Sequence, residues 1–123
     1  MSVPGFLLRR LYVKGSLQNT GTGFQFELKN MLGSGYARRM LPLTLDGEQV
    51  GMDQTQFTAA GTTTSFASVS EETPFTLAMN AITLITISGV PLSVGPHKIT
   101  MGFEVPGLGT LSFDITDVVS YDK

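Results

Sequence analysis

The stretch that decides the fold is HKITMGFEVPGLGTLSFDIT, residues 97–116. In both of its halves, apolar residues alternate with polar residues or glycine: Ile99, Met101, Phe103 and Val105 in the first half, and Leu111, Phe113 and Ile115 in the second. A period of two is typical of a strand with one buried face. The Pro106-Gly107-Leu108-Gly109 segment between the halves favours a turn. The stretch therefore predicts an antiparallel hairpin.

The same pattern extends towards the N-terminus. In residues 23–29, Phe24, Phe26 and Leu28 share one face of a predicted strand. Further strands are predicted over residues 7–17, 40–45, 48–50, 56–58, 64–69, 75–79 and 82–88, with a tight turn at Asp46-Gly47. The 82–88 segment has apolar residues on both faces, which is typical of a central strand or of a strand covered at an interface. Residues 32–35 and 59–64 are predicted to be loops.

The chain contains 14 glycines and 6 prolines, and no long segment has apolar residues at helical spacing. Many short strands between frequent turns are typical of sandwiches and barrels. We therefore predict an all-β fold, an antiparallel two-sheet β-sandwich or related barrel of about 8–10 strands with little or no helix. The length of 123 residues fits one domain, residues 1–123.

The amino-acid composition excludes several kinds of functional site. The chain has no cysteine, which excludes disulfides, thiolate nucleophiles and zinc ribbons. Its N-terminus lacks the pattern of a signal peptide, and no apolar run approaches the roughly 20 residues of a membrane helix, so we expect a cytoplasmic protein that binds no membrane. Only 15% of the residues are charged, which indicates a large core or a partner surface.

Charge is distributed unevenly along the chain. Residues 1–40 carry six basic and one acidic side chain (6 − 1 = +5), whereas residues 41–123 carry two basic and nine acidic ones (2 − 9 = −7). Such a split can indicate nucleic-acid binding, but no basic stripe with interleaved aromatic residues accompanies it. We expect early basic segments to pair with late acidic strands, and we predict no nucleic-acid partner.

Groups for catalysis are scarce. The one histidine, His97, is either a general base or lone metal ligand, or a strand-entry residue that bonds to a loop, and the pattern favours the second interpretation. Neither Glu71 with Glu72 nor Asp114 with Asp117 is predicted to converge, because their strand parities differ. No phosphate loop, GxGxxG or GxSxG motif is present. The sequence therefore predicts no catalytic residue, no metal site and no cofactor.

Two arginine pairs are candidate ligand or interface residues together with His97: Arg9 and Arg10, and Arg38 and Arg39. Each pair lies in apolar sequence, so alternation predicts that one member of each points inward. An inward arginine needs a partner. That partner is a carboxylate or phosphate ligand, an acidic surface of another protein, or an acidic residue of a later strand, and the last is favoured.

Several segments also resemble a known family of short proteins. They are LLRRLYVKGSLQNT at 7–20, GFQFELKN at 23–30, PLTLDGE at 42–48, GPHKI at 95–99 and LSFDI at 111–115. The resemblance that these segments mark extends over most of the chain. Members often carry the name hydroxymethylglutaryl-CoA reductase, and the pattern more distantly resembles the small β subunits of bacterial C-glycoside deglycosidases. The second resemblance implies a sandwich subunit beside a metal-dependent catalytic subunit.

These observations favour a non-catalytic accessory subunit that partners a separate metal-dependent sugar- or glycoside-processing enzyme. An alternative is a self-assembling homo-oligomer, because the +5/−7 charge split can drive association. A second alternative is a small ligand-binding domain or enzyme that uses His97, Tyr12, Tyr36 or Tyr121 with the arginines. Because permanent interfaces resemble a core cut in half, the apolar composition fits a protein partner.

Overall fold

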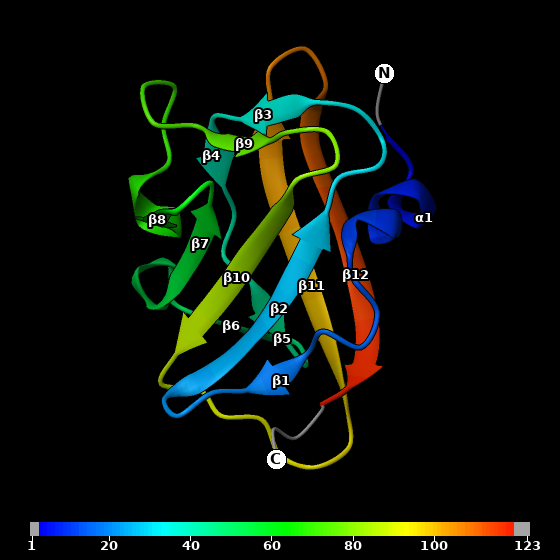
Figure 1. Cartoon of the computed structure of the whole chain (residues 1–123), viewed down its shortest axis with the longest axis vertical. Coiled ribbons are helices and arrows are strands. Elements are labelled where there is room, and N and C mark those ends of the chain that lie inside the picture. The colour runs from blue at the N-terminus through cyan, green and yellow to red at the C-terminus, as the bar shows by residue number, and fades with distance from the viewer. Residues whose placement is uncertain (1–2, 120–123) are drawn as a thin grey trace.

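Two antiparallel sheets pack face to face in the computed structural model, which describes residues 3–119 (Figure 1). The first sheet has the order β1-β2-β10-β7-β8, with bounds Gln18–Asn19, Gly23–Lys29, Ile82–Ser88, Thr55–Ala59 and Thr62–Ser65. The second has the order β12-β11-β5-β6, with bounds Gly109–Val118, Pro96–Val105, Thr44–Leu45 and Glu48–Gln49, and β4 (Arg39–Met40) also pairs with β11. A two-stranded sheet of β3 (Gly35–Ala37) and β9 (Phe75–Leu77) crosses one end. The fold is an all-β sandwich, as predicted.

The predicted hairpin is confirmed as the β11–β12 pair. Its register runs from Pro96 opposite Val118 to Val105 opposite Gly109. The turn uses positive φ angles at Gly107 and Gly109, a conformation that glycine adopts without strain. The alternating residues of both strands point into the core: Ile99, Met101, Phe103, Leu111, Phe113 and Ile115 are all buried.

The core lies between the two sheets. Phe24, Phe26 and Leu28 of β2 are buried as predicted. The adjacent β10 lies between β2 and β7, which confirms the prediction of a central strand. At one end of the core the Phe75 ring packs edge-on against Phe57, with centroids 4.7 Å apart. This end of the core lies beneath the β3–β9 ribbon (Figure 1).

The predicted strand over residues 7–17 is wrong. Gly5–Leu8 forms a short α-helix, α1, and Arg9–Leu11 continues it as a 3₁₀ helix, η1. Leu8 and Leu11, three residues apart, are both buried, so this segment buries a helical face rather than a strand face. Only Tyr12 makes a β-bridge, to Leu28. Within residues 3–119, no helix is long and apolar enough to cross a membrane.

Three other boundaries differ from prediction. The predicted 40–45 strand breaks at Pro42, because proline cannot donate to a ladder, and becomes β4 and β5. The predicted 64–69 strand ends at Ser65, whose side chain accepts a hydrogen bond from the Ala67 N–H and caps the 3₁₀ helix η3 (Phe66–Ser68). Another 3₁₀ helix, η2, spans Met52–Gln54. The predicted 59–64 loop is instead the turn and flanking residues of the β7–β8 hairpin. The described residues form twelve strands rather than about eight to ten.

Candidate functional site

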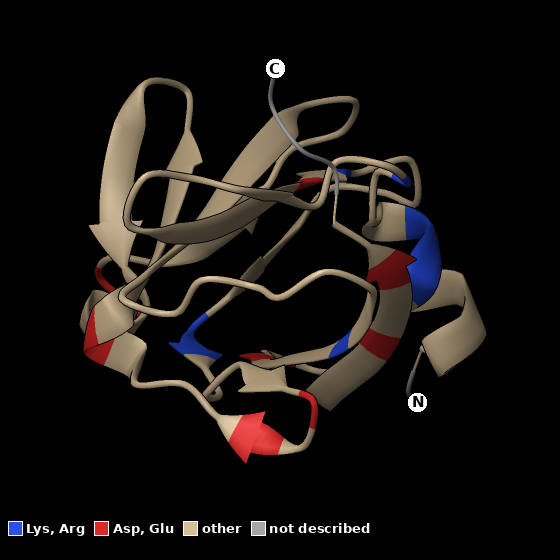
Figure 2. Cartoon of the chain, turned by 90° about the horizontal axis from the view of Figure 1, so that it is seen from below, with Lys and Arg blue, Asp and Glu red and all other residues tan. Residues whose placement is uncertain are grey.

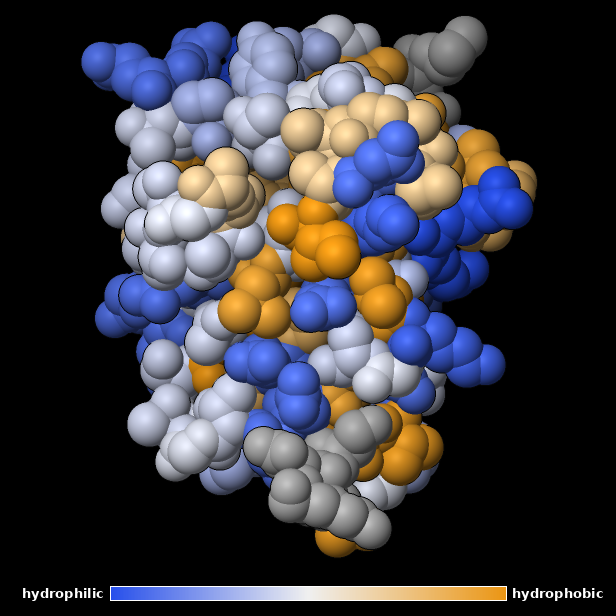
Figure 3. All heavy atoms as spheres, in the orientation of Figure 1, coloured by the Kyte–Doolittle hydropathy of each residue, from blue (hydrophilic) through white to orange (hydrophobic). Residues whose placement is uncertain are grey.

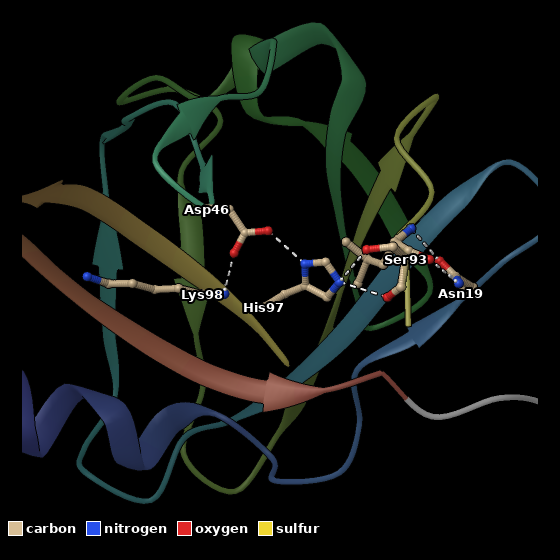
Figure 4. A network of polar contacts seen from close by, with 6 residues as sticks. Asn19, Asp46, Ser93, His97 and Lys98 are labelled. Atoms are coloured by element: carbon tan, nitrogen blue, oxygen red, sulfur yellow. Dashed lines mark hydrogen bonds and ion pairs between the residues drawn. The ribbon is translucent and has the colours of Figure 1, made fainter. Parts of the chain in front are cut away.

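His97 lies at the start of β11, in the inward row that continues with Ile99, and is only 8% exposed. Its Nδ1 is 2.7 Å from Oδ2 of Asp46 in the β5–β6 turn. Its Nε2 is 2.8 Å from the carbonyl oxygen of Ser93 in the loop before β11. Figure 4 shows the imidazole held between these two acceptors. This arrangement matches the strand-entry histidine that the sequence favours.

Both ring nitrogens of His97 face oxygen atoms that can accept a proton in a hydrogen bond. A neutral imidazole has only one N–H, so both bonds are made only by the imidazolium. The bond to Asp46 and the bond to Ser93 accordingly raise the pKa of His97. Asp46 also accepts from the Lys98 N–H at 2.8 Å, and this bond together with His97 lowers the pKa of the carboxyl. With both nitrogens engaged, His97 fastens the β5–β6 turn and the loop before β11 to the start of that strand.

The same loop is fastened from its other side by Asn19 of β1. The Asn19 side chain donates to the Leu92 carbonyl at 2.9 Å and accepts from the Leu92 N–H at 2.8 Å. This reciprocal pair satisfies the peptide groups of Leu92, whose side chain is buried. The network in Figure 4 therefore connects the two sheets through the loop that precedes β11.

The His97–Asp46 pair predicts a pH-dependent stability. The pKa of His97 is raised in the folded state. Its contribution to the stability of the fold is therefore fully present below its ordinary pKa of 6.5, and it is lost as the pH rises through the folded-state pKa. The pKa of Asp46 is lowered, so its contribution is present above its ordinary 3.8 and is lost as the pH falls through the folded value. We expect the free energy of unfolding, measured in urea, to decrease as the pH rises above about 6.5.

Asp46→Asn is the matched control for this dependence. Asp46 has a positive φ, which asparagine tolerates. The amide keeps one oxygen acceptor, which can serve either the Lys98 N–H or Nδ1 of His97, while the charge is removed. The variant should fold and lose most of the pH slope. A wild-type unfolding energy that stays level from about pH 6 to pH 9 contradicts the assignment of an imidazolium.

Three of the four arginines, Arg9, Arg38 and Arg39, form ion pairs within the chain, and neither pair has an inward member. Arg9 donates from Nε to the Asp114 carbonyl at 2.8 Å and lies 3.2 Å from its carboxylate. Arg38 and Arg39 both reach Glu104, at 3.3 and 3.7 Å. Figure 2 shows the basic η1 segment beside the acidic bands of β12. Early basic residues thus pair with late acidic ones, which is the interpretation that the sequence favours.

The expectation of an inward arginine in each pair is wrong, and the reason is local structure. Arg9 and Arg10 lie on a 3₁₀ turn, where strand alternation does not apply, and both are exposed. Arg38 lies between β3 and β4, where the chain changes sheets, so it is exposed like Arg39. His97 and Glu104 lie seven residues apart on β11, or about 23 Å. The predicted residues therefore do not form one site.

Tyr12 and Asp117 form a polar contact that the sequence did not predict. The Tyr12 hydroxyl donates to Asp117 at 2.7 Å, and the Gly15 N–H donates to the same oxygen at 2.9 Å. Burial and the adjacent carboxylate raise the pKa of Tyr12. Burial opposes ionisation of Asp117, but the hydrogen bonds from Tyr12, Gly15 and Val118 outweigh it and lower the carboxyl pKa. This contact fastens the segment after η1 to β12. Tyr121, another tyrosine of the ligand-binding alternative, lies outside the described residues.

One end of the sandwich carries an exposed apolar surface. We call it the apolar end, and it comprises six exposed residues from the segments around β3, β9 and the β11–β12 turn: Met31, Leu32, Tyr36, Met79, Ile82 and Leu108. Part of this surface is visible as orange and pale orange spheres in the upper half of Figure 3. The Ser34 hydroxyl accepts from the Met79 N–H at 3.1 Å, which joins the 30–34 and 78–81 loops. Exposed apolar patches on soluble domains mark binding surfaces.

A pocket of about 280 Å³ opens within the apolar end. Its rim includes Leu32, Tyr36 and Leu108, and its walls include Phe75 and Phe103 from the core. Apart from the interest attached to Tyr36, no sequence pattern predicted this pocket, because its lining residues come from four stretches that lie far apart in the chain: 3–11, 30–37, 75–77 and 103–111. Among residues 3–119, no group of three or more His, Cys, Asp or Glu side chains could hold a metal ion.

The two packed sheets and the end pocket define the class of protein: an all-β sandwich domain with an exposed apolar surface and a pocket at one end. The chain belongs to the family of hydroxymethylglutaryl-CoA reductase N-terminal domains, whose family model matches residues 7–120. This match confirms the resemblance to the reductase-named proteins. The more distant resemblance to β subunits of C-glycoside deglycosidases stays a prediction. No curated protein matches the chain.

Proposed function

We propose that this domain is a non-catalytic accessory subunit that docks through the apolar end onto a separate metal-dependent enzyme that processes a sugar or glycoside. The observation that carries the proposal is the gathering of exposed apolar side chains at one end, among them Met79 at 48% exposure. When a partner covers large apolar side chains, it removes them from water, and this lowers the free energy of the complex.

The nature of the partner rests on the two family likenesses. The family description names one domain of a reductase, which is a portion of a larger enzyme. The β subunits that the chain more distantly resembles also accompany a separate catalytic subunit. Both likenesses associate a sandwich domain with a catalytic unit, and the second supports a metal-dependent sugar or glycoside enzyme as that unit.

The polar groups of the described residues are consistent with this role. His97 has both nitrogens engaged, and Asp46 and Asp117 each accept at least two hydrogen bonds that fasten loops. Arg9, Arg38 and Arg39 lie in ion pairs within the chain. These side chains stabilise the sandwich, whereas the apolar end is available for contact.

A charge placed in the apolar end tests the docking surface. We expect Met79→Asp to weaken the complex by about 30-fold or more, as for a hot-spot residue, because a carboxylate would be desolvated at the interface. The matched control is Val94→Asp, since Val94 is also an exposed loop residue (81%) but lies outside the apolar end. The measurement is the dissociation constant between this chain and the catalytic partner, isolated from the native complex, identified by mass spectrometry and separately purified.

The partner's chemistry decides the remainder of the proposal. Addition of this chain should raise the partner's glycosidic or sugar turnover, and a chelator should abolish that turnover while the complex persists. A partner without metal-dependent sugar activity overturns the assignment of enzyme class. Dispersal of a homo-oligomer by Met79→Asp, with no second polypeptide involved, supports self-assembly instead.

A further inference from the structure

The pocket in the apolar end has an apolar interior that reaches the core. Leu8, Leu11 and Leu111 line it together with Phe75 and Phe103, and all five are almost fully buried. Its depth therefore extends from the exposed rim to the centre of the fold. Water finds few polar partners on such a lining, so the pocket favours an apolar ligand.

The polar groups near the pocket are uncharged and mostly satisfied. Asn30 donates to the Gly33 and Leu77 carbonyls at 2.7 and 2.8 Å, and its Oδ1 accepts from the Leu32 and Gly33 N–H groups. Its side chain thus holds the 30–34 loop in place as one wall and has no capacity left for a ligand. None of the described residues that line the pocket carries a charge.

Two hydroxyl groups near the rim remain able to bond a ligand. Ser34 accepts from the Met79 N–H, so its own O–H is free to donate. Tyr36 lines the pocket, is exposed, and its hydroxyl makes no hydrogen bond within residues 3–119. These groups suit a small uncharged head group such as a hydroxyl.

We propose that this pocket binds the aliphatic tail of a neutral amphiphile, with its uncharged head group at the Ser34 and Tyr36 rim. The volume of about 280 Å³ admits an alkyl chain of several carbons. A carboxylate head finds no cation in the lining and is disfavoured. This inference goes beyond the accessory role and does not depend on it, since the isolated chain binds the ligand.

The test is a titration of the whole chain with straight-chain alcohols, followed by backbone amide chemical shifts. From butanol to octanol we expect the affinity to rise about fourfold per methylene, and to level off once the chain is longer than the pocket. Shifts should concentrate at Ala37, Leu77 and Leu111, which line the pocket. Octanoate should bind at least about tenfold more weakly than octanol, because burial beside neutral groups disfavours its charge.

A plugging variant supplies the control. Gly35 lines the pocket and lies on the same face of β3 as the buried Ala37, and a Cβ added there meets no atom within 4 Å. Gly35→Leu should therefore place a side chain at the pocket without disturbing the fold and weaken octanol binding by about tenfold or more. Gly21→Leu is the matched control, because its Cβ also meets no atom within 4 Å and it lies outside the pocket.

Three results overturn the inference: no saturable binding of any alcohol to the wild-type chain, equal binding of octanol and octanoate, or unchanged binding by a folded Gly35→Leu variant. The wild-type shift map decides the matter even if that variant fails to fold. A negative result leaves the Met79→Asp docking test unaffected, so the two proposals fail separately.

Discussion

Phe75→Ala is expected to lower the free energy of unfolding by about 3–5 kcal/mol, the range for a buried phenylalanine. Phe75 is fully buried and contacts rings from both sheets. Its centroid lies 4.7 Å from that of Phe57 and 5.9 Å from that of Phe103. Removal of the ring leaves a cavity between the sheets, next to a pocket that is already present. Urea unfolding, followed by circular dichroism, measures the loss.

Phe6→Ala is the matched control, because Phe6 is 65% exposed at the start of α1. We expect its unfolding energy to change by no more than about 0.5 kcal/mol, as is usual for surface substitutions. Equal losses for the two variants would show that Phe75 does not join the sheets. Since domains of this size have only about 5–15 kcal/mol of stability, Phe75→Ala is also expected to raise the unfolded population strongly.

Gly23→Ala is expected to lower the free energy of unfolding by about 3 kcal/mol, the upper end of the usual cost of overpacking. Gly23 begins β2 opposite Ser88 of β10, and a Cβ there would collide with the backbone carbonyl of Ile87. Backbone atoms in a paired strand cannot move aside as the end of a side chain can. Relief of the collision requires the end of the β2–β10 ladder to separate, which exposes its peptide groups.

The control for this substitution lies two residues earlier. A Cβ at Gly21 meets no atom within 4 Å, so Gly21→Ala should change the unfolding energy by no more than about 0.5 kcal/mol. Amide hydrogen exchange adds a local measurement, because Gly23→Ala should lose protection first at Ile87 and Ser88. A Gly23→Ala variant as stable as Gly21→Ala would contradict the close approach of β2 and β10.

The first helical segment illustrates where pattern reasoning failed. Residues 7–17 contain enough leucine, valine and tyrosine to favour a strand, yet Leu8 and Leu11 bury one face of a helical turn. Contact with β12 and β2 stabilises this turn, and those strands lie far away in the sequence. Short helices are unstable without packing, so this turn depends on contacts with distant strands. A pattern of neighbouring residues contains no information about those contacts.

The candidate site was predicted only in part. His97 was expected to begin a strand and bond to a loop, and it does, but its partner Asp46 is 51 residues away. The arginines were expected to pair with late acidic residues, and Arg9 reaches Asp114 across 105 residues of chain. Residue type and strand parity indicated the kind of contact. They could not indicate which carboxylate the fold would bring within reach.

The sequence by itself determined the β11–β12 hairpin, the inward faces of β2 and β11, and the central position of β10. The hairpin and the inward faces depend on alternation within about ten residues, which burial of one strand face imposes locally. The central position of β10 was indicated by apolar residues on both of its faces. Tertiary structure alone decided the helical start, the pairing partners of His97 and Arg9, and the pocket in the apolar end. Each of these depends on segments that meet only after the sheets have packed, and proximity in space is not encoded in any short pattern of residues.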